Sequence, residues 1–302
     1  MTKTFLVTLL VFCALIDLKA DLRQTRRQLE LINPDAVRTA LIELHSSVKV
    51  INLGGDVTIN FTKIPAGKMT TTAGKMIFFT KPLWVETHEI GNRQFAEFNA
   101  AHDSRIETGD FLQFGVAERG FPCNLPLQPV SHVSALEAEE FYIWLSRKTG
   151  MRCRLPTADE WQWFARAGSN YANQWKERPQ EFNRTANLAD KSFNAVQTLG
   201  WGLLSRAIPP WRKAALDVDD GHRVCSPAGE FKANQWGLFD TIGNVWEWTT
   251  DVTRDGDKIA CGGSWATRPQ KAGFNSRIAY KDWQKVYDVG FRIVMENVHK
   301  NR

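Results

Sequence analysis

The chain has 302 residues, of which 43% are hydrophobic and 24% are charged. This length suits two domains or one large irregular domain, and the composition excludes an intrinsically disordered chain. The formal net charge of +5 is small, and its basic residues are too scattered for a nucleic-acid-binding surface. No fixed period runs through the chain, which excludes repeat proteins. Twelve tryptophans against four tyrosines indicate a core filled by large amphipathic rings.

The first predicted element is an export signal over residues 1–20. Lys3 supplies its positive charge, an apolar run from Phe5 to Ile16 follows, and Ala20 is the small residue before a cleavage site. We therefore expect a cleaved signal peptide and an exported protein, periplasmic or secreted. The alternative is a protein tethered to the membrane by an uncleaved N-terminal segment. No later stretch is long and apolar enough to cross a bilayer, so we expect no membrane span after cleavage.

A helical segment is expected next, over residues 21–53, because apolar residues recur at helical spacing up to about residue 48. Gly54 and Gly55 end it. From Val57 onward apolar and polar residues alternate, which predicts a strand, and the apolar run over residues 76–85 predicts a second extended segment.

Two later helices have capping boxes at their N-termini. The box at Ser134–Glu137 predicts a helix that ends at Gly150, and the box at Thr157–Glu160 predicts a helix that ends at Gly168. A further helix is expected near residues 92–101. The second half of the chain has few periodic stretches, and long irregular runs in a compact domain are usually functional or held by something such as bound cations.

Four cysteines follow the predicted signal, and no two of them form a C-x-x-C pair: Cys123, Cys153, Cys225 and Cys261. Their spacing excludes a zinc ribbon and a thioredoxin-type motif. In an oxidising compartment they allow three pairings, which the sequence does not rank. We expect one or two structural disulfides.

The segment 234–248, NQWGLFDTIGNVWEW, closely resembles the N-x-x-G-L-x-D-M-x-G-N-V-W-E-W signature of the formylglycine-generating enzyme (sulfatase-modifying factor) family. Further segments are similar to motifs of that family and follow its order: PVSHVS at 129–134, LPTADEW at 155–161, AG at 167–168, AN at 186–187, SPAG at 226–229, GGSW at 262–265 and GFR at 290–292. The resemblance spans about residues 55–295. It implies an α+β, C-type-lectin-like fold that is low in regular secondary structure, and we assign this domain to residues 54–302.

The resemblance also implies two structural calcium ions, which take oxygen ligands. The first calcium set consists of two acidic side chains and two backbone carbonyl groups: Asp240, Glu247, Gly243 and Val245. The second calcium set consists of two side chains and two backbone carbonyl groups: Asn187, Asp220, Leu188 and His222. The alternative is that Asn244 and Glu247 only satisfy backbone groups in a tight turn. The order of the motifs favours metal at the first calcium set, and at the second, where His222 replaces an apolar residue, the two interpretations stand even.

The sequence departs from the family at its redox site. The family's enzymes are expected to hold Cu(I) between two cysteines that closely follow the G-G-S-x motif, and Thr267 and Ala272 stand at those two positions. Hydroxyl and methyl groups do not bind Cu(I), so we expect no copper. Cys261 precedes the Gly262–Gly263 turn and is not expected to reach the same place.

Two functional hypotheses follow. The first is a calcium-stabilised, non-catalytic binding or accessory protein that binds a protein partner through residues 267–289; by analogy with the family, the partner belongs to a kinase or secretion system. The alternative is an oxidoreductase of the same superfamily, of the formylglycine-generating or non-haem iron type, with an unrecognised metal site. No two of the six histidines have the H-x-x-x-H-x-E spacing of those iron enzymes. We favour the first hypothesis and leave enzymatic activity open.

Overall fold

The computed structural model describes residues 47–71, 74–104, 123–169, 179–192 and 218–296. The predicted signal peptide and most of the predicted helical segment lie outside these residues and stay predictions. The chain divides into two compact units, residues 1–50 and 51–302. Of the first unit only residues 47–50 are described, and they include the start of strand β1. Among the described residues no helix combines the length and the apolar character needed to cross a bilayer.

A five-stranded sheet has the strand order β1-β2-β5-β11-β6. The pairs β2–β5, β5–β11 and β11–β6 are antiparallel, so the last strand of the chain lies between two strands that precede it by more than 130 residues. The five strands are β1 (Val48–Gly54), β2 (Val57–Ile64), β5 (Leu83–Glu86), β11 (Val294–Glu296) and β6 (Arg152–Arg154).

The strand β1 corrects the prediction of helix over residues 21–53 at its C-terminal end. Ile51 and Leu53 are buried, whereas Asn52 and Gly54 between and after them are exposed. This two-residue period is that of a strand with one buried face, and pairing with β2 decides its conformation. The strand predicted from Val57 is confirmed as β2.

A second sheet has the strand order β10-β7-β8-β9, in which β10 runs parallel to β7 and the other pairs are antiparallel. Its strands are β7 (Trp246–Val252), β8 (Lys258–Gly262), β9 (Gly273–Tyr280) and β10 (Val289–Gly290). A separate hairpin joins β3 (Gly67–Thr70) and β4 (Met76–Phe79). The extended segment predicted over residues 76–85 is therefore two strands, β4 and β5, separated by a bend at residues 80–82 that contains Pro82.

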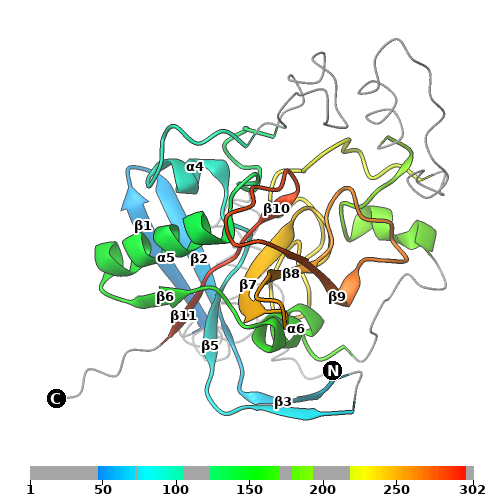
Figure 1. Ribbon diagram of the computed structural model, residues 1–302, viewed down its shortest axis with the longest axis horizontal. Coiled ribbons are helices and arrows are strands. Elements are labelled where there is room, and N and C mark those ends of the chain that lie inside the picture. Colours follow the sequence, from blue (N-terminus) through cyan, green and yellow to red (C-terminus); the bar gives the residue numbers. More distant parts are fainter. Residues whose placement is uncertain (1–46, 72–73, 105–122, 170–178, 193–217, 297–302) are drawn as a thin grey trace, which may run out of the picture. The chain divides into compact units, whose positions relative to one another are not determined.

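Both predicted capping boxes are formed. The Ser134 hydroxyl accepts a hydrogen bond from the Glu137 amide at 3.2 Å, and the Thr157 hydroxyl accepts one from the Glu160 amide at 3.1 Å. They begin α5 (Ala135–Thr149) and α6 (Ala158–Arg166), which Figure 1 shows as green ribbons. Gly150 ends α5 in the left-handed conformation, whereas Ala167 rather than Gly168 ends α6. The helix expected at residues 92–101 is shorter, α4 (Asn92–Ala96), and a 3-10 turn, η2, covers Pro179–Arg184.

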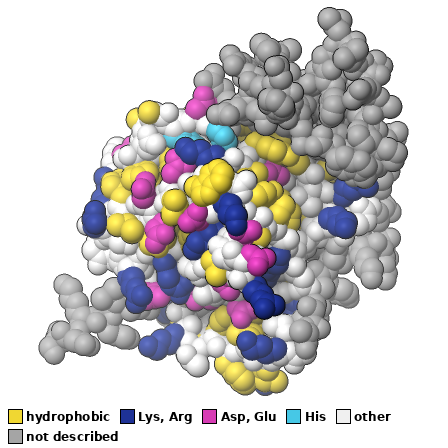
Figure 2. Space-filling model, viewed as in Figure 1, with side chains coloured by type: hydrophobic (Ala, Val, Ile, Leu, Met, Phe, Trp, Pro, Cys, Tyr) yellow, Lys and Arg dark blue, Asp and Glu magenta, His cyan; other side chains and the backbone are white. Residues whose placement is uncertain are grey.

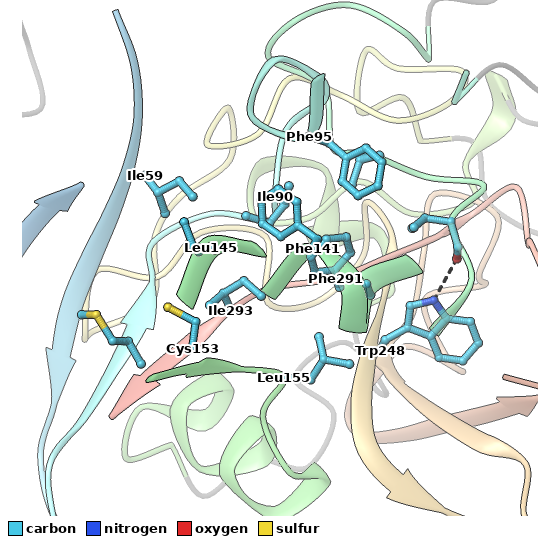
Figure 3. Close-up of a cluster of buried hydrophobic side chains, with 14 of the residues drawn as sticks. Ile59, Ile90, Phe95, Phe141, Leu145, Cys153, Leu155, Trp248, Phe291 and Ile293 are labelled. Atoms are coloured by element: carbon cyan, nitrogen blue, oxygen red, sulfur yellow. Dashed lines mark hydrogen bonds between the residues drawn. The ribbon is translucent and has the colours of Figure 1, made fainter. Parts of the chain in front are cut away.

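The largest apolar cluster lies between α5, α4 and the five-stranded sheet (Figure 3). The Phe141 ring of α5 stacks on Phe95 with ring centres 5.4 Å apart and meets Phe291 edge-on at 5.4 Å. The Trp248 indole nitrogen donates to the Val133 carbonyl at 2.9 Å. Trp246, Trp248 and Trp265 are all core residues, each at most 7% exposed, in line with the ring-filled core that the composition indicates.

On the face shown in Figure 2, basic and acidic side chains of the described residues are interspersed with apolar ones, and the basic side chains do not gather in a stripe. The described residues therefore provide no concentrated basic footprint on that face.

Replacing Phe141 tests whether this cluster is the core. Phe141→Ala should lower the free energy of unfolding by about 3–5 kcal/mol, because the surrounding rings cannot collapse into the space left behind. The matched control is Ile143→Ala, on the exposed side of α5, where a loss below about 1 kcal/mol is expected. Urea unfolding measures both, and equal losses would contradict this account of the core.

Candidate functional site

The turn before β7 gathers the residues of the first calcium set. Asp240, Gly243 and Asn244 all have positive φ angles, so the backbone curls tightly and directs polar groups inward. A Cβ atom at Gly243 would lie 2.3 Å from the carbonyl oxygen of Asn187, which explains the glycine and brings the two calcium sets against each other.

Asn244, completely buried, connects the two sets. Its amide N–H donates to the Asn187 carbonyl at 2.8 Å, and its side-chain oxygen accepts from the Ser226 amide at 2.9 Å and from the Asn187 side chain at 3.3 Å. Its side-chain nitrogen donates to Glu89 at 3.2 Å. Asn244 therefore satisfies backbone and side-chain groups around this tight turn, and metal at the first calcium set stays a prediction.

Glu247 is engaged by a buried cation of the protein itself. Its two carboxylate oxygens accept from the Arg292 guanidinium at 2.8–3.1 Å and from the Trp161 indole nitrogen at 2.8 Å. Three N–H donors thus bond to this carboxylate, and the Arg292 Nε–H is shared between its two oxygens. Both Glu247 and Arg292 are at most 1% exposed. Arg292 and Glu247 thus form a fully buried ion pair.

Buried acids outnumber this single arginine. Glu86, Glu89 and Asp240, like Glu247, lie close enough to Arg292 to interact with its charge. Burial raises the pKa of Asp240 to about 6 and raises the pKa values of Glu86 and Glu89 well above their usual range. One oxygen of each of these three acids has no hydrogen-bond partner among the described residues. Such a cluster requires protons or an additional cation. Sequence reasoning did not assign Glu86 or Glu89 to the site.

Direct hydrogen bonds join three members of the second calcium set. The Asp220 carboxylate accepts from the amide of Leu188 at 3.0 Å and from the amide of His222 at 2.9 Å. The Asn187 side-chain nitrogen donates to the Val224 carbonyl at 2.8 Å, while its side-chain oxygen is buried without a partner among the described residues. A hydroxyl group, that of Ser192, already donates to the His222 carbonyl at 2.9 Å.

A second acid, Asp190, accompanies this set and was not predicted from the sequence. It is buried, and its carboxylate accepts the Asp220 amide at 2.8 Å. Burial, and next the charge of Asp190, raise the pKa of Asp220 to about 8. The carboxylates of Asp190 and Asp220 and the unpartnered side-chain oxygen of Asn187 are hard oxygen groups, the kind of ligand that calcium prefers. Calcium at either set stays a prediction: in the first, Glu247 is already bonded to Arg292 and Trp161, and in the second, Asp190 lies beside Asp220.

Thr267 and Ala272 both lie close to Gly263. A Cβ atom at Gly263 would be 3.1 Å from the Ala272 methyl carbon and 3.5 Å from the Cβ of Thr267. The Thr267 hydroxyl accepts from the Ser264 amide at 3.0 Å, and the Ser264 hydroxyl donates to Asp288 at 2.6 Å. The structure thus brings the two positions together, and neither carries a thiol.

Cys261, on β8, is buried in a cluster that also contains Ala272. Burial raises the pKa of its thiol to about 12, which disfavours the thiolate that Cu(I) requires. No disulfide joins any of the four described cysteines in this structure, so the expected disulfides stay a prediction.

The sequence matches the family described as "Sulfatase-modifying factor enzyme 1-like domain" over residues 45–297. The chain belongs to this family. A curated relative, the inactive C-alpha-formylglycine-generating enzyme 2 of Bos taurus, is 33% identical over 142 residues, which cover 45% of this chain and 38% of the relative. The formylglycine-generating enzyme of Mycobacterium tuberculosis (strain ATCC 25618 / H37Rv) is 33% identical over 122 residues, which cover 40% of this chain and 33% of that enzyme. The matches thus span well under half of the length of either relative.

The structure of PvdO from Pseudomonas aeruginosa superposes with a TM-score of 0.61 at 21% identity, covering 82% of this chain and 98% of PvdO. This likeness shows the fold, which is the C-type-lectin-like, α+β fold of the formylglycine-generating enzymes, low in helix as the motifs predicted. The sulfatase-modifying factor motif G-N-V-W-E-W is thus the turn and strand that present Asn244 and Glu247 to the buried polar groups.

The excess of buried acids predicts an asymmetry between two substitutions. Arg292→Met should lower the free energy of unfolding by roughly 3–5 kcal/mol, because it leaves four buried acids without their cation. Glu247→Gln should cost less, because Glu86 and Glu89 still face the arginine. Chemical unfolding measures both, with the exposed pair-breaking variant Lys281→Met as the control that changes little. A larger loss for Glu247→Gln would show that the other acids do not share Arg292.

Proposed function

We propose that this chain is a non-catalytic binding or accessory member of the sulfatase-modifying factor family, exported and stabilised by calcium. The observation that carries the proposal is the pair Thr267 and Ala272, which lie together at the positions expected for the copper-binding cysteines. Their hydroxyl and methyl groups supply no soft ligand. The similarity to a relative named inactive supports the same conclusion, although an enzyme is matched at equal identity.

Calcium is proposed at the second calcium set. The side chains of Asn187 and Asp220 and the carbonyl groups of Leu188 and His222 would hold it. The bound ion supplies positive charge, which offsets the repulsion between Asp220 and Asp190. These residues belong to loops outside the named strands and helices, so a cation there would fix backbone that no sheet ladder holds.

The partner surface is proposed over residues 267–289, and the partner is a protein, by family analogy a component of a kinase or secretion system. Trp283 supports this surface because it is 65% exposed. Large exposed aromatic side chains are enriched at protein–protein interfaces, where a few of them contribute most of the binding energy. The neighbouring segment 262–266 is fixed to the core through buried Trp265, so the surface is presented from a rigid base.

Calcium removal tests the metal. In EGTA the melting temperature should fall by about 5–10 °C relative to saturating calcium, because an ion bound only to the folded state stabilises that state by about 3 kcal/mol at one hundred times its Kd. Asp220→Asn should abolish the difference. Asp219→Asn, at the exposed neighbouring residue, is the matched control and should keep it. Equal melting curves for the parent protein with and without calcium would refute a structural ion.

Restoring two thiols tests the lost copper site. The double variant Thr267→Cys/Ala272→Cys should bind one equivalent of Cu(I) against a chromophoric chelator, because the Cβ atoms of both residues lie close to the same point beside Gly263. The parent chain and the single variant Thr267→Cys should leave the copper with the chelator. Stoichiometric, chelator-resistant copper or iron in the parent protein would defeat the non-catalytic proposal and favour an oxidoreductase with a different metal site.

A further inference from the structure

Two of the four described cysteines lie side by side in the interior. Cys123 and Cys225 are 0% and 2% exposed and belong to one apolar cluster with Val224, Val245 and Trp265. Their thiols form a hydrogen bond with each other, and this contact, together with burial, raises the pKa of Cys225 well above its usual range.

Backbone and side-chain hydrogen bonds hold the two cysteine segments next to each other. The Gln128 side chain donates to the Cys225 carbonyl at 2.7 Å, and the Ala228 amide donates to the Leu127 carbonyl at 2.8 Å. On the other side, Asn92 donates to the Cys123 carbonyl at 2.8 Å. Two cysteines that share one buried cluster, with interacting side chains on anchored segments, are well placed to be joined.

The other two cysteines are placed elsewhere. Cys153 lies on β6 in the cluster around α5 (Figure 3), and Cys261 lies on β8 in the cluster around α6. The three apolar clusters thus separate Cys153 and Cys261 from each other and from the adjacent pair. The placement of the four cysteines therefore supports one disulfide, between Cys123 and Cys225, and does not support a second between Cys153 and Cys261.

We propose that Cys123 and Cys225 form a disulfide when the protein folds in an oxidising compartment, and that Cys153 and Cys261 remain thiols. One sulfur–sulfur bond forms, and the two S–H bonds break. Two protons and two electrons pass to the disulfide of a thiol–disulfide oxidoreductase or of oxidised glutathione, which becomes two thiols. Because the folded pair is buried, the bond forms before the cluster closes around it.

The bridge would act on the irregular part of the chain. It closes a loop from residue 123 to residue 225, which contains all four members of the second calcium set. A loop of about 100 residues loses much of its unfolded-state freedom when its ends are joined, so the melting temperature should rise by about 5–15 °C. The proposal itself does not depend on calcium.

The test compares the full chain produced in an oxidising compartment with the same chain produced in a reducing cytosol. Both are denatured in an alkylating reagent, digested without reduction and mapped by mass spectrometry. The oxidised sample should yield one linked pair of peptides that contain Cys123 and Cys225, lighter than their sum by two hydrogen atoms, with Cys153 and Cys261 alkylated. Alkylation of Cys123 and Cys225 in that sample, or a bridge to another cysteine, would overturn the proposal.

Variants provide the second readout. The melting temperature of the parent protein should fall by about 5–15 °C on reduction, and Cys123→Ala and Cys225→Ala should each abolish this dependence. Cys153→Ala is the matched control and should preserve it. A reduction-dependent shift that persists in Cys225→Ala would overturn the proposal, and the peptide map of the parent protein decides the question if that variant does not fold. A metal ion retained by the two thiols in the oxidised sample would also refute the bridge.

Discussion

The buried guanidinium of Arg292 holds together the parts of this domain that no sheet ladder connects. It bonds to Glu247 on β7, to the Glu86 carbonyl at the end of β5 and to the Phe239 carbonyl in the loop before the turn. Burying a guanidinium costs free energy unless almost all of its N–H donors have acceptors. Each of the three guanidinium nitrogens of Arg292 donates at least one hydrogen bond. A large movement of the turn relative to the two sheets would break these hydrogen bonds and leave the buried guanidinium without acceptors. The interaction therefore fixes the position of the turn relative to both sheets.

The same arginine determines where a further cation is favourable. The Glu247 carboxylate of the G-N-V-W-E-W motif is already bonded to Arg292. It therefore neutralises a cation of the protein itself. Among the described residues, the buried oxygen atoms left without donors lie in two regions: Glu86, Glu89 and Asp240 near Arg292, and Asn187 in the second calcium set. Asn244 joins these two regions through its bonds to Asn187 and Glu89, so an ion in the loops of the second calcium set would also order the turn. Residue identity alone carries no information about which lone pairs are occupied.

Features with local causes could be predicted from the sequence. The capping boxes at Ser134 and Thr157 each need only four residues, and both formed as expected. Pairing across the chain was not predictable in this way: β1 is a strand because β2 lies beside it, and β11 lies between β5 and β6. The acids Glu86, Glu89 and Asp190 belong to the site through such long-range placement, since no short motif marks them. The family motifs supplied the fold and the position of Thr267 and Ala272, because a fixed order of several motifs reflects the whole architecture.

The two candidate ligand positions differ in what their polar groups lack. At Thr267 the hydroxyl is bonded to Ser264, whose own hydroxyl reaches Asp288, so this region satisfies its polar groups internally. At Asn187 and Asp220 a buried oxygen has no donor and two carboxylates repel each other. A ligand-binding site described without its ligand is expected to contain buried polar groups that lack partners. A position that binds no ligand is expected to have its polar groups paired within the protein. The unpartnered Asn187 oxygen and the paired acids Asp190 and Asp220 are therefore the observations on which the calcium proposal rests, whereas the Thr267 hydroxyl already has protein partners.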